Sequence, residues 1–117
     1  MTFPINDQSP VEHNAALPPE ADAVVIGGGI IGVMTAWELA KAGLKTVLLE
    51  KGRVAGEQSS RNWGWIRAQG RDKAEIPIML EAQAMWGELD AHVGGVGLAT
   101  TGTLFMAAKD EDMAGYQ

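Results

Sequence analysis

Three glycines and one acidic residue in the first half of the chain have the spacing of a dinucleotide-binding motif. Gly27, Gly29 and Gly32 follow an apolar run at residues 23–26, and Glu50 comes 23 residues after Gly27. The first glycine permits a tight turn, the second lets backbone N–H groups approach a diphosphate, and the third lets a helix lie close to the strand. The Glu50 carboxylate can accept hydrogen bonds from two ribose hydroxyls and disfavours a 2′-phosphate. The pattern predicts binding of an adenine dinucleotide.

A strand–helix–strand unit has to position these residues. The apolar residues 23–26 predict a strand, residues 30–42 a helix, and residues 45–49 a second, parallel strand. The helix N-terminus would face the phosphates, where its unpaired N–H groups and positive dipole end suit a diphosphate without a basic side chain. Ala36 extends the small surface of this helix toward the sheet. A glycine triplet alone is often an ordinary tight turn, but here strand, helix and acid all lie at the required offsets.

Length and composition exclude several classes of protein. A chain of 117 residues fits one small domain and is too short for a complete two-domain redox enzyme. Its formal charge of −6 argues against a nucleic-acid partner. The absence of cysteine excludes disulfides and thiolate metal sites and fits a reducing compartment, so we expect a cytoplasmic protein. No apolar run approaches the length of a membrane span, and no metal site is expected.

Composition shifts divide the chain into three parts. Residues 1–21 contain four of the five prolines and no Lys or Arg, which predicts a flexible leader that cofactor binding does not require. Residues 22–75 form the dinucleotide-binding part. Residues 76–117 begin a further part, with a helix that starts close to Pro77 and ends at a glycine-rich break after Val93.

The last part of the chain predicts one helix and one strand. An apolar stripe on the helix is typical of core packing. It consists of Met79, Ala82, Trp86, Leu89 and Val93. Residues 100–107 predict a strand, and residues 109–112 a turn into another helix.

Small hydrogen-bonding side chains lie in the polar segment after Glu50. Ser59, Ser60 and Asn62 stand near an expected helix start, where they either cap the helix or contact a cofactor. Capping is the more common role for such residues. A basic cluster follows, and it is either a solvated face or an anion-binding group. It consists of Arg61, Arg67, Arg71 and Lys73.

Taken together, four segments of the sequence resemble the start of the FAD-dependent D-amino acid oxidase family, which includes glycine oxidase, sarcosine oxidase and D-amino acid dehydrogenases. The segments are residues 25–32, 50–52, 59–64 and 101–104, and the resemblance runs from about Ala21 to the end of the chain. It implies an α/β fold with an incomplete Rossmann-like FAD-binding domain, followed by the first strand of a second, substrate-binding sheet.

The resemblance implies a role for several residues. The counterparts of Gly27, Gly29 and Gly32 hold the FAD pyrophosphate, and that of Glu50 holds the adenosine ribose. Lys51 would contact the adenine side through its backbone, and the segment from Ser59 to Gly64 resembles one that lies along the pyrophosphate and reaches the flavin. The predicted cofactor-binding residues are therefore Gly27, Gly29, Ile31, Gly32, Glu50, Lys51, Ser59, Ser60, Gly64 and Trp65.

Two readings of the aromatic pair in this segment stay open. Trp63 and Trp65 either border the flavin ring or serve as ordinary packing, which is the more common role of large aromatic side chains.

Some relatives attach flavin covalently through Cys or through His in the segment equivalent to residues 61–65. Neither residue occurs there, so we expect noncovalent FAD.

The resemblance predicts the N-terminal part of an enzyme that oxidises amines or D-amino acids by hydride transfer to flavin N5. The family's catalytic side chains lie mostly beyond the matching region, so none is assigned, and the 117-residue chain alone is expected to be inactive. Two rivals stay open: a fragment of an NAD-binding enzyme, and a truncated, non-catalytic chain that pairs with a missing C-terminal portion.

Overall fold

Apolar, β-branched residues on either side of one helix form a small parallel sheet. The computed structural model describes residues 5–113 and residue 115, and the chain divides into two units, Met1–Gly64 and Trp65–Gln117. The elements of the first unit are β1 (Ala23–Ile26), α1 (Ile30–Lys41), β2 (Thr46–Leu49) and one turn of 3-10 helix at Gln58–Ser60.

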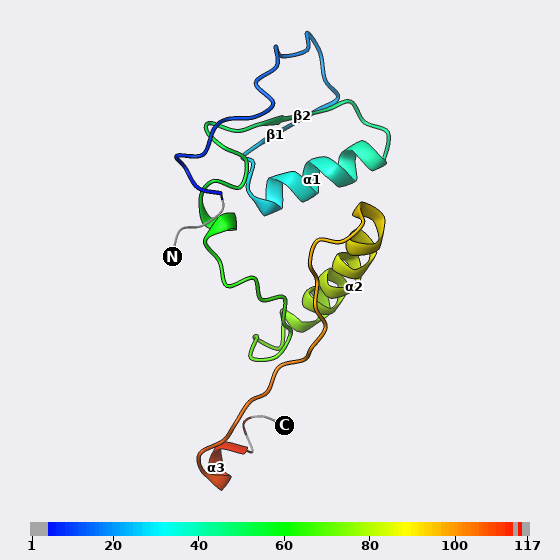
Figure 1. Cartoon of the computed structure of the whole chain (residues 1–117). Helices are drawn as coiled ribbons and strands as arrows, with labels where there is room; N and C mark the ends of the chain where they lie inside the picture. The colour runs from blue at the N-terminus through cyan, green and yellow to red at the C-terminus, as the bar shows by residue number, and fades with distance from the viewer. Residues whose placement is uncertain (1–4, 114, 116–117) are drawn as a thin grey trace. The chain divides into compact units, whose positions relative to one another are not determined.

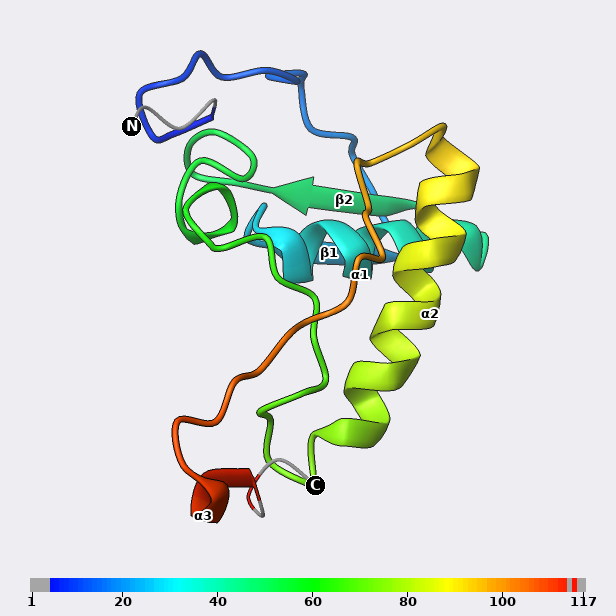
Figure 2. The same ribbon diagram turned by 60° about the horizontal axis from the view of Figure 1, so that its bottom comes forward.

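The two strands are neighbours, as the sequence predicts. β1 and β2 pair in parallel over their full length, with Ala23 opposite Thr46 and Ile26 opposite Leu49. The α1 helix connects them and contacts both strands (Figure 1, Figure 2). This arrangement confirms the predicted βαβ unit, a partial Rossmann-like fold.

A glycine ends α1 and sends the chain back into the sheet. Gly43 has a φ of +87°, in the left-handed region that favours glycine. Its N–H donates to the carbonyl of Ala40 at 2.9 Å, and the next N–H, that of Leu44, donates to the carbonyl of Leu39 at 3.1 Å. These two bonds make a Schellman motif, which satisfies helix carbonyls and lets β2 begin within three residues of Gly43.

One side of β1 is open to solvent. The side chains alternate along the strand, so that Val24 is 56% exposed and Ile26 is 85% exposed, whereas Ala23 and Val25 are partly covered. No large apolar side chain among the described residues is fully buried. A two-stranded sheet with a single covering helix therefore leaves apolar surface exposed.

The second unit contains the long helix that the sequence predicts. The α2 helix spans Ile76–Val93, with a proline in its first turn and Gly94 in the left-handed region at its end. In the predicted apolar stripe, the side chains from Met79 to Leu89 are partly covered, whereas Val93 is 48% exposed. Within the described residues, no helix combines the length and the apolar character needed to cross a membrane.

The prediction of a strand at residues 100–107 differs from the structure. This segment pairs with no other strand in the described part of the chain, where the sheet has only β1 and β2. A strand exists only with hydrogen-bonded neighbours, and none is provided here. A single helical turn, α3 (Asp110–Met113), follows where the sequence predicts the start of another helix.

Candidate functional site

The glycine turn between β1 and α1 is shaped by one left-handed backbone angle and one close approach. Gly27 has a φ of +109°, a conformation that residues with a Cβ rarely adopt. A Cβ on Gly32 would collide with the carbonyl oxygen of Gly27, which is backbone and has no side-chain freedom to move aside. The first turn of α1 therefore lies directly on the turn, as predicted for the third glycine of the motif.

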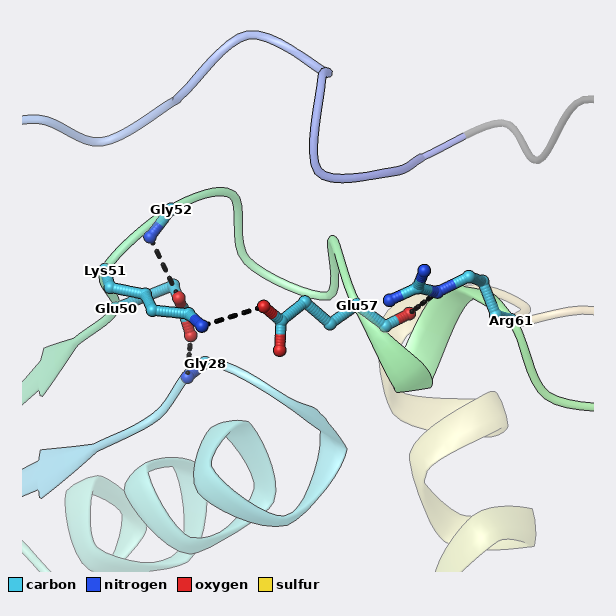
Figure 3. Close-up of polar contacts among 6 residues, drawn as sticks. All are labelled: Gly28, Glu50, Lys51, Gly52, Glu57 and Arg61. Atoms are coloured by element: carbon cyan, nitrogen blue, oxygen red, sulfur yellow. Dashed lines mark hydrogen bonds and ion pairs between the residues drawn. The ribbon is translucent and has the colours of Figure 1, made fainter.

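The carboxylate of Glu50 is held by two backbone amides. The N–H of Gly28 donates to Oε2 at 2.7 Å, and the N–H of Gly52 donates to Oε1 at 2.9 Å (Figure 3). These bonds, that of Gly28 first, lower the pKa of the Glu50 carboxyl below its ordinary value. A carboxylate has about four lone-pair positions, so each oxygen can still accept a ribose hydroxyl.

The loop after β2 folds back onto the glycine turn. Ala55 adopts a left-handed φ of +60° and donates its N–H to the carbonyl of Gly28 at 2.9 Å. Lys51 Nζ pairs with Glu57 Oε1 at 2.9 Å across the mouth of this loop, and this bond raises the pKa of the lysine (Figure 3). The loop thus forms a second wall opposite the turn.

Ser59 caps the helix of the motif rather than a helix of its own. Its Oγ accepts a hydrogen bond from the N–H of Ile30 at 2.8 Å, and the α1 N-cap, Gly29, has no side chain to do so. The serine O–H remains available to donate to another acceptor. Ser59 is therefore placed both to cap the helix and to meet a ligand at the helix N-terminus.

A cavity of about 360 Å³ opens between the turn and the loop. Its size lies in the range of small-molecule sites. The two cationic side chains on its wall, Lys51 and Arg53, are each paired with a carboxylate. The lining residues are Ile26, Gly27, Gly29, Leu49, Glu50, Lys51, Arg53, Ala55, Gly56, Glu57, Gln58 and Ser59. No cluster of three or more metal-ligating side chains occurs among the described residues.

The structure brings five of the ten predicted cofactor residues together at this cavity. They are Gly27, Gly29, Glu50, Lys51 and Ser59.

The other five predicted residues lie elsewhere. Gly32 lies in the first turn of α1, against the carbonyl group of Gly27, and Ile31 in the same turn is 80% exposed. Ser60 donates its hydroxyl to the carbonyl of Glu57. Gly64 donates its N–H to Asn62 Oδ1, at the end of the first unit. Trp65 belongs to the second unit, where the Arg67 guanidinium lies 5.5 Å from its ring centre.

Two glycines and one alanine in or beside the cavity wall were not identified as site residues from the sequence. Gly28 has its amide on Glu50, and a Cβ there would lie 3.0 Å from the Glu50 Cβ. Gly56 also has no room for a side chain, because a Cβ would lie 2.9 Å from the carbonyl oxygen of Arg53. Gly28 and Gly56 could have been identified from the sequence, because glycine is the residue that fits where a Cβ has no room. The left-handed conformation of Ala55 could not, because alanine does not indicate it.

The bonds to Glu50 predict acid sensitivity of the turn. Because its pKa is lowered in the native state, Glu50 stabilises the fold at pH values above 4.5, the ordinary pKa of a glutamate. This contribution is lost as the pH falls through the native pKa. We expect Glu50→Gln to lower the urea midpoint at neutral pH, with the difference from wild type shrinking as the pH falls below 4.5. Glu38→Gln is the control, since the Glu38 side chain pairs with Lys41 on the exposed surface of α1. A pH-independent difference would contradict this assignment.

The fold and the glycine turn define a partial Rossmann-like domain. The chain belongs to the FAD-dependent oxidoreductase family, whose sequence model matches residues 22–117.

Similar proteins place this family in context. The mitochondrial pyruvate dehydrogenase phosphatase regulatory subunit of Mus musculus is 31% identical over 101 residues, which are 85% of this chain and 12% of the relative. The N-methyl-L-tryptophan oxidase of Salmonella arizonae is 35% identical over 75 residues, 61% of this chain and 20% of that enzyme. Among solved structures, an L-amino acid deaminase from Proteus vulgaris, with its specific insertion deleted, is 37% identical with a TM-score of 0.80. The match covers 87% of this chain and 27% of the deaminase, so the chain spans only 12% to 27% of these three proteins.

Proposed function

We propose that this chain is the FAD-binding part of a flavin-dependent oxidoreductase that oxidises amines or amino acids. The observation that carries the proposal is the geometry of Glu50, whose carboxylate is held by the amides of Gly28 and Gly52 in the wall of a cavity beside the glycine turn. The family match then selects FAD among the dinucleotides.

The residues at the cavity suit this cofactor. Gly27 and Gly29 leave the turn bare of side chains, and the N-terminus of α1 directs backbone N–H groups toward the same place. Ser59 offers its O–H to a phosphate oxygen, and Glu50 accepts the ribose hydroxyls. The diphosphate charge does not have to be neutralised by the paired cations on the wall, because amides and the helix dipole favour a diphosphate.

The oxidation itself is chemistry of the cofactor. Bound FAD supplies the acceptor for a hydride from the carbon next to the substrate nitrogen. The chain's own residues hold and orient the adenosine diphosphate half. These 117 residues contain no cysteine, and residues 61–65 contain no histidine, so we expect this chain to hold the cofactor noncovalently.

The substrate class is proposed from two of the three similar proteins, which are named for amino acids: an N-methyl-L-tryptophan oxidase and an L-amino acid deaminase. We place the substrate-binding and catalytic groups in protein outside the 117 residues of this chain, and we expect the chain alone to be inactive. The exposed face of β1, at Val24 and Ile26, supports this view, because it offers apolar surface for such protein to cover.

The first test is cofactor binding by the 117-residue chain, with its folding checked by circular dichroism. We expect FAD absorbance to coelute with the chain in gel filtration, and the flavin to be released by acid because it is not covalently attached. NAD at the same concentration should not be retained. A folded chain that retained NAD but not FAD would favour the NAD-binding alternative and refute the proposal.

A second test addresses the substrate class. In a protein that contains this chain together with its substrate-binding part, adding the substrate without oxygen should bleach the oxidised flavin spectrum. We expect bleaching by amino acids or N-methylated amino acids and none by 2-hydroxy acids of the same side chain. Bleaching by the hydroxy acids alone would refute the proposed C–N chemistry.

A further inference from the structure

The N-terminal leader lies against the loop that forms the second wall of the cavity. Arg53 in this loop pairs with Glu12 of the leader, at 2.9 Å between a guanidinium nitrogen and Oε2. A Cβ on Gly56 would lie 3.2 Å from the carbonyl oxygen of Asn6. A second cavity, of about 190 Å³, is lined by Asp7 together with Glu50 and other residues of the loop. The leader thus forms part of the surroundings of Glu50, which also lines the main cavity.

The ion pair is unlike the others in the described residues. The Arg53 side chain is only 13% exposed, whereas the cations of the other ion pairs among the described residues are 41% to 78% exposed. A largely buried guanidinium requires a partner, because an unpaired charge in such a place is costly. Glu12 is that partner. Without it, we expect Arg53 to turn toward solvent and to leave the cavity wall.

The leader also has local structure of its own at this point. The N–H of Ser9 donates to the carbonyl of Asn6 at 3.0 Å, and the N–H of Asn6 donates to Ser9 Oγ at 3.0 Å. Asn6 Oδ1 accepts from the N–H of Gln8 at 2.8 Å. These bonds form a side-chain-stabilised turn. The segment that approaches the loop is therefore a defined turn and not an extended chain.

We propose that residues 5–12 are part of the cofactor site, with Glu12 as a positioning residue that keeps Arg53 at the wall of the cavity. The inference rests on the proposed FAD function. Glu50 lines both cavities, so the leader would enclose the ribose and adenine end of the ligand rather than the flavin end. The cofactor and the leader would both contact the loop after β2. Each would therefore stabilise the loop conformation that the other binds, so that cofactor binding and docking of the leader favour each other.

The test uses the full 117-residue chain and two measurements. Glu12→Gln should weaken FAD binding roughly three- to tenfold. Without any ligand, the same substitution should speed hydrogen exchange at the amides of Ala55 and Gly56, which bond within the turn and loop. Glu12→Asp, which keeps the charge, should recover part of both effects. The matched control is Glu20→Gln, because Glu20 pairs with Lys45 in a solvent-exposed place away from both cavities.

The outcomes separate this inference from the proposed function. If the wild-type chain binds FAD, and Glu12→Gln has the same FAD affinity and the same exchange rates as wild type, this inference is overturned and the proposed function is not. If the folded wild-type chain failed to bind FAD, the proposed function would fail, and unchanged exchange in Glu12→Gln would overturn the docking of the leader as well. A chain that starts at Glu20 gives the same contrast: the sequence predicts undiminished FAD binding, whereas the structure leads us to expect weaker binding.

Discussion

Replacing Gly29 with valine should weaken FAD binding by this chain on the order of 10- to 100-fold. Gly29 lines the cavity, and its Cβ position lies 3.3 Å from Ser59 Oγ, where the diphosphate is expected. Its backbone angles of −75° and 176° are extended, so valine can adopt them without strain. The backbone of the turn therefore stays unstrained, but the new side chain fills the site and has to displace Ser59 Oγ by a few tenths of an ångström, which also disturbs the Ser59 cap of α1. FAD titration followed by flavin fluorescence measures the effect.

A control separates loss of the site from a general effect of added volume. Ala40→Val adds the same kind of side chain at an exposed position near the other end of α1 and should leave FAD affinity unchanged. Circular dichroism should show both variants to be folded. If Gly29→Val bound FAD as tightly as wild type, the diphosphate could not lie at the N-terminus of α1.

Replacing Gly32 with alanine should destabilise the first unit by about 1–3 kcal/mol. In an exposed helix the same change stabilises, by roughly 1 kcal/mol, because alanine has the higher helix propensity. Here the new methyl group would collide with the carbonyl oxygen of Gly27, so α1 has to move away from the turn. FAD affinity should fall with stability, since the amides of the helix N-terminus move with it. Urea denaturation and hydrogen exchange at the Val33 amide, which bonds Gly29, measure the effect.

The α2 helix contains a matched control. Gly87 also lies within a helix, but nothing is within 4 Å of its Cβ position. Gly87→Ala should therefore stabilise the chain by up to about 1 kcal/mol. Equal stabilisation by Gly32→Ala and Gly87→Ala would show that the close approach of α1 to the turn is absent in solution.

The βαβ unit was predictable because its determinants are local. The apolar runs, the glycine spacing and the Gly43 stop each act over a few residues, and β1, α1 and β2 occur where these signals place them. The prediction of a strand at residues 100–107 failed, because strand formation depends on hydrogen-bonded partners elsewhere in the protein and not only on the residues of the segment itself.

The candidate site was only partly predictable for the same reason. The sequence indicated Ser59 as a cap or a ligand-contacting residue, but not that it caps α1 across 29 positions. Glu50 was expected to meet a ribose, but its anchoring by Gly28 and Gly52 was not expected. The left-handed conformation of Ala55 has no sequence signal.

The sequence by itself determined the class of fold, the glycine turn and the acid that follows the second strand, because backbone sterics and apolar periodicity act through neighbouring residues. The tertiary structure decided which groups surround the turn. The loop folds back onto Gly28, and Glu12 of the leader reaches Arg53, only once the chain has closed on itself. Such contacts join residues 27 to 41 positions apart, and their formation depends on the free energy of the whole unit rather than on any short stretch of sequence.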